Sequence, residues 1–135
     1  MSSAPSHDLE PKVDLIASVA APPVPDDAEA MTILVTLPPG SPGAPAHRHP
    51  GPAFGYVIKG EMKFELEGQP PRVVKAGQAF WEPGGDVIHY SDANNRSDIR
   101  LRFLVTMVCA PGQPMLVVVD EDELEQRKDR RVQRP

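Results

Sequence analysis

The chain has 135 residues, the usual size of one domain, and its 17 prolines and 10 glycines would interrupt helices and central strands. Its formal net charge of −5 and the lack of a basic stripe among its aromatic residues remove the main attractive term for nucleic acid. No basic leader followed by an apolar run is present, and no segment approaches the roughly 20 apolar residues that cross a bilayer, so we expect a cytoplasmic protein without a membrane partner.

The N-terminal third contains few regular elements. Residues 1–12 are polar and interrupted by proline, which predicts a flexible arm. The run VDLIASV (residues 13–19) could form a first strand, and we place the start of the folded domain there. AMTILVTL (residues 30–37) is β-branched and apolar, which is typical of a buried strand, and the PPGSPGAP that follows predicts a long loop leading to residue 47.

The rest of the chain up to residue 120 alternates β-rich runs with turn residues. This spacing predicts strands near residues 55–59, 61–66, 71–75, 78–82, 87–91, 99–108 and 114–120. No stretch before residue 120 keeps a 3.6-residue apolar period long enough for a helix. About nine or ten strands predict an all-β domain over residues 13–120, built as a closed barrel or jelly roll.

The tail, residues 121–135, begins with acidic residues and ends with basic ones, an order that complements a helix dipole. Asp120 is suited to cap a short surface helix, with Glu123 at its third position. The basic end could instead contact an acidic surface of a partner. The single cysteine, Cys109, lies in an apolar run and is interpreted as a core residue.

The stretch HRH (residues 47–49) is a candidate for metal binding. Side chains two residues apart on a strand share a face, so His47 and His49 would project together while Arg48 points away. A barrel can bring a third imidazole, His89, to the same place from a later strand. Three imidazoles suit a divalent metal with open positions for water or substrate, although surface histidines and a hydrogen-bonded His89 would fit the pattern too.

These residues resemble the two motifs of the cupin family. HRHPGPA (residues 47–53), followed by six residues and Gly60, is similar to the first motif, in which H-x-H is followed by three residues, a glutamate, six residues and a glycine. Gly77, followed by five residues and PGGDVIH (residues 83–89), resembles the second motif. The resemblance implies a double-stranded β-helix, or jelly-roll, barrel with the three histidines as metal ligands.

The chain departs from the family pattern at three points. Ala53 stands at the position of the family's glutamate, His89 comes one residue later than in P-x-G-x-x-H, and neither Gly40 nor Gly43 lies at the usual distance before His47. Three neutral imidazoles without a carboxylate would leave the full charge on a divalent ion. Such a centre should favour anionic chelating ligands such as enolates.

Glu82 is the carboxylate best placed to compensate for Ala53, because it comes just before the turn at Pro83. It could be a metal ligand, a hydrogen-bond acceptor for an imidazole or a catalytic base, or it could lie exposed on its strand. The aromatic residues beside the two motifs either line an apolar pocket or belong to the barrel core. These aromatic residues are Phe54, Tyr56, Phe80, Trp81 and Tyr90.

We therefore expect a metal-dependent enzyme that acts on a small organic, enolate-forming molecule, as a dioxygenase or as an isomerase or cyclase. The similarity to the three-histidine cupins, which include thiol dioxygenases and a diketone-cleaving dioxygenase, implies one divalent ion per chain: iron, zinc, manganese or nickel. The alternatives are a non-catalytic module that binds or senses a small molecule or metal, and a metal-free sugar epimerase, which would leave H-x-H unexplained. Open strand edges, which small cupins commonly pair with a second copy, predict a homodimer.

Overall fold

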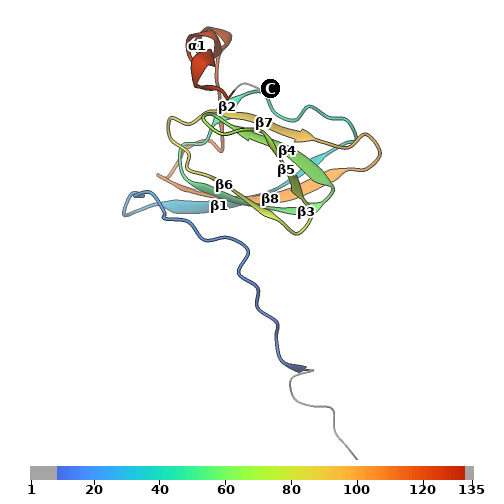
Figure 1. The fold of residues 1–135 in the computed structure, drawn as a ribbon. Helices are drawn as coiled ribbons and strands as arrows, with labels where there is room; N and C mark the ends of the chain where they lie inside the picture. Colours follow the sequence, from blue (N-terminus) through green and yellow to red (C-terminus); the bar gives the residue numbers. More distant parts are fainter. Residues whose placement is uncertain (1–8, 133–135) are drawn as a thin grey trace, which may run out of the picture.

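Two antiparallel sheets form the folded part of the chain, in a computed structural model that describes residues 9–132. The strands are β1 (Glu29–Leu37), β2 (His47–Arg48), β3 (Ala53–Lys59), β4 (Glu61–Leu66), β5 (Arg72–Lys75), β6 (Ala79–Glu82), β7 (His89–Asn94), β8 (Leu101–Cys109) and β9 (Val117–Val118). One sheet, called sheet A here, has the order β1-β8-β3-β6, and sheet B has the order β5-β4-β7-β2-β9. Figure 1 shows the sheets facing each other, which confirms the predicted jelly-roll barrel.

The core lies between the sheets and follows from the two-residue period of the strands. In β8, Leu101, Phe103, Val105, Met107 and Cys109 are all buried, while the residues between them are at least partly exposed. Alternate residues of a strand point to opposite faces, so this strand has one interior face and one exterior face. The prediction that Cys109 is a core residue is confirmed.

On the interior face of the ladder between β3 and β6, small residues of β3 stand opposite large residues of β6. This pairing determines where the side chain of Glu82 can lie. Ala53 pairs with Glu82 and Gly55 pairs with Phe80, and all four residues are buried. A Cβ atom at Gly55 would lie only 1.9 Å from the Phe80 ring. The small residues of β3 therefore leave the space that the larger side chains of β6 occupy.

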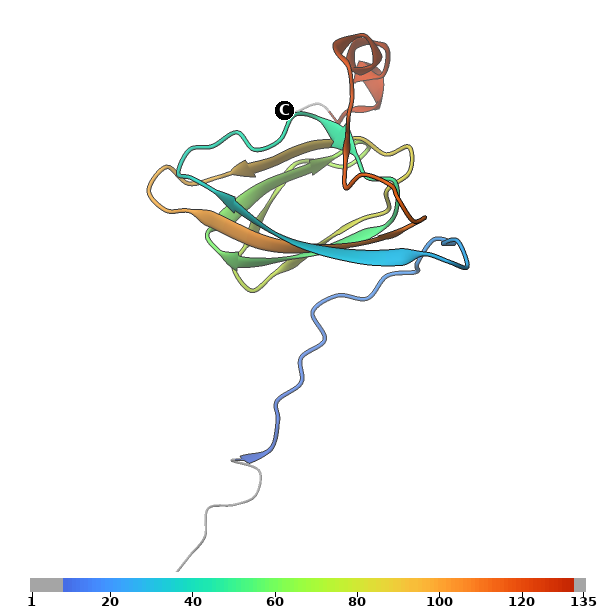
Figure 2. The same cartoon turned by 180° about the vertical axis from the view of Figure 1, so that it is seen from behind.

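The segment before β1 differs from the prediction. Residues 13–19 form no strand and are exposed, and Figures 1 and 2 show this part of the chain running away from the barrel. The apolar run was misleading because a strand also needs a neighbouring edge to supply hydrogen bonds, and no described strand pairs with this segment. Of the predicted flexible arm, residues 1–8 lie outside the described residues.

The C-terminal elements agree with the prediction only in part. The strand expected over residues 114–120 is reduced to the two residues of β9. Helix α1 (Glu121–Gln126) is capped as expected, because Asp120 Oδ1 accepts a hydrogen bond from the Glu123 amide at 2.8 Å. A 3-10 turn, η2 (Lys128–Arg130), follows it. Within residues 9–132, no helix is long and apolar enough to span a membrane.

Candidate metal centre

Three histidine side chains meet in the interior of the barrel. His47 and His89 are directly paired on the neighbouring strands β2 and β7, and His49 follows β2 by one residue. The His47 ring centroid lies 4.9 Å from that of His49 and 4.8 Å from that of His89. All three side chains are buried, and their nitrogen atoms available as ligands lie within 4.8 Å of one another. The expected convergence of the three imidazoles is therefore observed, and the cluster could hold a metal ion.

One ring nitrogen of each histidine is held by a backbone carbonyl, which orients the ring. The distances are 2.7 Å from His47 Nδ1 to Pro45 O, 2.8 Å from His49 Nδ1 to Met115 O and 2.7 Å from His89 Nε2 to Ser91 O. A neutral imidazole has a single N–H to donate, so these bonds leave Nε2 of His47 and His49 and Nδ1 of His89 with free lone pairs. Bonds of this kind fix the tautomer that a metal needs.

Glu82 lies at the end of β6 and is brought into this cluster. Its side chain is 2% exposed, and its Oε1 atom lies 2.9 Å from His89 Nδ1 and 3.3 Å from His49 Nε2. Glu82 is also the residue directly opposite Ala53 across the β3–β6 ladder. The carboxylate of Glu82 thus comes from the neighbouring strand, directly opposite the position where the family's glutamate would stand.

The contact between Glu82 and His89 indicates how well these residues fit a cation. Nδ1 of His89 is buried without a hydrogen-bond partner in the described part of the chain, although Glu82 Oε1 is 2.9 Å away. With the ring proton on Nε2, both atoms present lone pairs, and such a contact is repulsive unless a proton or cation lies between them. Ligand atoms about 2.1 Å from a common ion lie roughly 3.0–3.4 Å apart in octahedral or tetrahedral geometry, close to the two contacts of Glu82. The residues present therefore fit a divalent metal.

Electrostatics around Glu82 keep the carboxyl ionised. Burial raises the pKa of Glu82, but its interactions with His49 and His89 outweigh burial and lower the pKa to about 2. Burial also lowers the pKa of His47, and for His49 the interaction with Glu82 outweighs burial and raises the pKa. Glu82 is therefore anionic and favours protonation of His49, so a bound cation would have to displace the proton that the two side chains share.

A small cavity of about 40 Å³ opens beside the cluster. Its polar end contains the three histidines with Glu82 and Asp92, and its other walls are mostly apolar. The residues of those walls are Ile33, Val35, Phe80, Phe103, Val105, Met115 and Leu116. Among the described residues, none that lines the cavity is Lys or Arg, so an anionic ligand would find no cation of these residues there other than a protonated histidine.

The aromatic residues flanking the motifs fall into different environments. Of the five candidates, only Phe80 lines the cavity. Phe54 and Tyr56 are 39% and 40% exposed on the outer face of sheet A, and Trp81 contacts Phe54 there with ring centroids 4.6 Å apart. The Tyr90 ring lies under the guanidinium of Arg131. Phe80 thus lines the cavity, whereas Phe54, Tyr56 and Trp81 belong neither to the cavity nor to the buried core, because alternate residues of β3 and β6 face outward.

Asp92 is a cavity residue that the sequence pattern did not indicate. Three residues after His89 on an ideal strand, it should face the opposite side from His89. A register shift opposite residues Glu65 and Leu66 places an extra residue in β7 and turns Asp92 inward, where it is 8% exposed. Asp92 Oδ1 accepts a hydrogen bond from the Ala44 amide at 2.9 Å. An alternation broken by a bulge could have been found only from the strand pairing.

The fold and the histidine cluster define a jelly-roll protein with a candidate metal site inside the barrel. The sequence model of the cupin domain matches residues 33–107, more than half of the chain. The chain therefore belongs to the cupin family. No curated protein matches the chain.

Solved structures with the same fold include enzymes. DMSP lyase DddQ from Ruegeria pomeroyi DSS-3 is 26% identical with a TM-score of 0.56, over 70% of this chain and 44% of the lyase chain. An RmlC-like cupin from Shewanella frigidimarina NCIMB 400 is 24% identical with a TM-score of 0.51, over 62% of this chain and 69% of the other. An oxalate oxidase in complex with glycolate is 23% identical with a TM-score of 0.55, over 82% of this chain and 67% of the other. This chain thus spans less than half the length of the lyase.

Proposed function

We propose that this cupin is a metal-dependent enzyme acting on a small organic molecule, with one divalent ion per chain bound by His47, His49, His89 and Glu82. The observation that carries the proposal is the orientation of the buried ring nitrogens. Backbone carbonyls hold one nitrogen of each ring, and the free nitrogens of His49 and His89 face the same Glu82 oxygen at 3.3 and 2.9 Å. When bound, the metal would supply Lewis acidity, and iron would add redox chemistry.

Among the roles considered for Glu82, we assign that of the fourth ligand. Its distances to two imidazole nitrogens are those expected between ligands of one ion, and burial beside them leaves the carboxylate little freedom to move. Asp92 then becomes the candidate for holding or moving a proton, because it lines the same cavity with one oxygen bonded to the Ala44 amide.

The cavity limits the class of substrate. About 40 Å³ is far below the roughly 300–1,000 Å³ of sites for drug-sized ligands, so the substrate is small or enters as the wall at Met115 and Leu116 moves. Since no Lys or Arg of residues 9–132 lines the cavity, one anionic group such as an enolate would be bound by the metal itself. The apolar walls suit the remaining part of such a molecule. An enzyme with the same fold, the lyase that is 26% identical, supports catalysis in general terms.

The proposed function is tested by elemental analysis of protein purified without added metal, followed by assays of the metal-loaded protein. We expect close to one divalent ion per chain. Oxygen uptake with diketones, thiols or catechols would indicate a dioxygenase, and product analysis by NMR without oxygen uptake would indicate an isomerase or cyclase. Stoichiometric metal binding with no turnover of any candidate would favour the non-catalytic binding module. Protein that binds no divalent metal would contradict the proposal.

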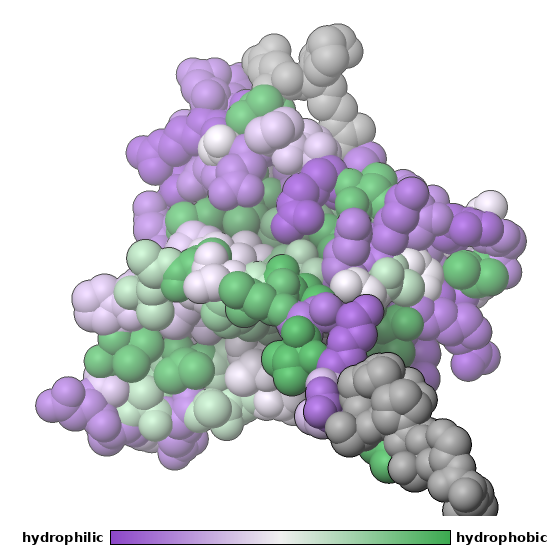
Figure 3. All heavy atoms as spheres, turned by 60° about the horizontal axis from the view of Figure 1, so that its bottom comes forward, coloured by the Kyte–Doolittle hydropathy of each residue, from purple (hydrophilic) through white to green (hydrophobic). Residues whose placement is uncertain are grey.

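We also propose that the chain forms a homodimer through the outer face of sheet A. Leu34, Leu104 and Tyr56 pair across three strands of this face and are 49%, 38% and 40% exposed. Figure 3, which brings this side of the molecule forward, shows apolar side chains gathered there. In addition, Val13 and Leu15 of the extended arm are more than 80% exposed. Large apolar surfaces of this kind mark interaction sites.

The area of the face favours a second copy that also receives the arm. Four strands about 4.8 Å apart and seven residues long give a face of roughly 440 Å². A standard interface buries about 800 Å² on each partner, so the sheet alone supplies about half of it. The apolar arm preceding β1 can supply the rest of the buried area if it packs against the surface of the second copy.

The substitution Leu104→Glu should convert the dimer to a monomer, because a charge would be buried in the centre of the interface. Light scattering coupled to gel filtration at micromolar concentration measures the mass. Gln69→Glu, which adds the same charge in an exposed turn, should leave the dimer intact. A wild-type protein of monomer mass, or a dimer that survives Leu104→Glu, would show that this face does not bind a second copy.

A further inference from the structure

The segment that carries two of the candidate ligands, residues 47–49, contains one of the shortest strands of the barrel. Strand β2 contains only two residues, and it pairs with β7 at one position and with β9 at two. A strand this short has few backbone hydrogen bonds to keep its rotation fixed. Since His47 lies in β2 and His49 directly follows it, and both project into the cavity, a small rotation of this segment would move both imidazoles. Other contacts must therefore hold the segment in place.

Arg48, the residue between these histidines, makes such contacts on the opposite side. Its side chain is 18% exposed, and its guanidinium forms a forked ion pair with Glu123 of α1, in which Nη1 lies 3.0 Å from Oε1. Its Nε atom also donates to the carbonyl of Asp86 at 3.1 Å. A forked arginine–carboxylate pair fixes orientation as well as distance. Arg48 thus joins β2 to the C-terminal helix and to the loop between β6 and β7.

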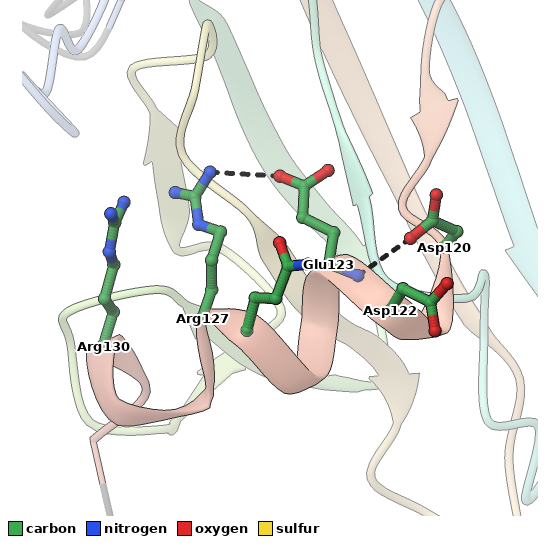
Figure 4. Close-up of a pocket in the computed structure, with 6 residues that line it drawn as sticks. Asp120, Asp122, Glu123, Arg127 and Arg130 are labelled. Atoms are coloured by element: carbon green, nitrogen blue, oxygen red, sulfur yellow. Dashed lines mark hydrogen bonds and ion pairs between the residues drawn. The ribbon is translucent and has the colours of Figure 1, made fainter.

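The helix is itself held to the barrel, so that it can serve as an anchor. Arg127 pairs with Glu67 at 3.0 Å from Nε and with Asp86 at 2.9 Å from Nη1, and it also reaches Glu123 at 3.2 Å. Figure 4 shows Arg127 and Glu123 side by side on the helix. Beyond η2, Arg131 donates to both oxygens of the buried Glu65. Asp86 lies in the short connection between Glu82 and His89, so this network contacts every segment that carries a candidate ligand.

We propose that the Arg48–Glu123 ion pair is a positioning element of the metal centre. It holds the outer side of β2 against α1, and this keeps His47 and His49 turned toward the cavity. The basic residues at the end of the tail pair with acidic residues of this chain and hold α1 to the barrel. In this proposal they support the metal centre and do not contact a partner. The inference rests on the proposed metal site, but it assigns a role to residues that do not contact the cavity.

The test compares Glu123→Gln with Glu125→Gln. Both substitutions remove one negative charge from the same helix, but Glu125 is exposed and contacts only Lys128 among the described ion pairs. Cobalt(II) alone is the probe, because its affinity can be measured by competition with a chelator and its visible spectrum reports the geometry of its ligands. We expect Glu123→Gln to weaken cobalt binding about 10-fold, the lower end of the loss when a group that orients a metal ligand is removed, and to alter the spectrum. Glu125→Gln should match the wild type.

Arg48→Lys is the second variant, since it keeps the charge but loses the fork. It should also weaken binding and change the spectrum, and circular dichroism should show the wild-type fold. If the wild type binds cobalt and both Glu123→Gln and Arg48→Lys bind it as Glu125→Gln does, the positioning role is wrong although the metal site stands. If the wild type itself binds no cobalt, the proposed function fails and this inference fails with it.

Discussion

Replacing His47, His49 or His89 by alanine should each lower the affinity for a divalent metal by at least about 100-fold, since removing a residue that only orients a ligand already costs about 10–100-fold. The three side chains are buried together and each has a ring nitrogen free for a metal. Metal content after dialysis and a chelator competition measure the effect.

A matched control for these variants is His7→Ala, because His7 is the remaining histidine of the chain and belongs to neither motif. This variant should keep the wild-type affinity. Circular dichroism separates loss of metal from loss of fold, and an asparagine variant can replace any alanine variant that unfolds. Full metal retention in all three site variants would show that the ion binds elsewhere.

The Glu82→Gln substitution should weaken metal binding about 10- to 100-fold and reduce any turnover by a larger factor than it reduces stability. Glutamine keeps the shape of the side chain but loses the charge that faces the two imidazoles. Glu121→Gln, on the exposed surface of α1, makes the same chemical change away from the site and is the matched control. Unchanged affinity in Glu82→Gln would exclude this carboxylate from the metal centre.

A paired substitution sharpens this prediction. Ala53 and Glu82 face each other across one ladder rung, so the double variant Ala53→Glu with Glu82→Ala moves the carboxylate to the family's position while conserving the total volume. It should recover most of the affinity that Glu82→Ala loses. Ala53→Glu alone should be the poorer variant, because it crowds two carboxylates into a site where Ala53 is 1% exposed. Recovery no better than in Glu82→Ala would show that residue 53 does not reach the metal.

Motif spacing predicted the histidine cluster because it depends on local geometry. His47 and His49 are two residues apart, which is one period of an extended chain, so their side chains share a face. His89 joins them because it pairs directly with His47 across β2 and β7. The sequence left open whether Glu82 faces the interior or the solvent, since this depends on the register in which β6 pairs with β3. Asp92 was missed for a related reason, because the bulge in β7 reverses the alternation.

The C-terminal network could not be predicted at all. Arg48 and Glu123 are 75 residues apart, and nothing in the charge pattern distinguishes this pair from many other surface combinations. The tail was correctly expected to begin with a capped helix, because capping depends only on neighbouring residues. The predicted strand over residues 13–19 was wrong because local apolar character does not supply a partner edge.

The most direct test of the metal centre is an anomalous difference map from crystals of metal-loaded protein, recorded at the absorption edge of the bound metal. We predict a single peak per chain, bound by Nε2 of His47, Nε2 of His49, Nδ1 of His89 and the carboxylate of Glu82 at distances of about 2.0–2.3 Å. A peak outside the barrel, or no peak among the three imidazoles, would contradict the proposed metal centre.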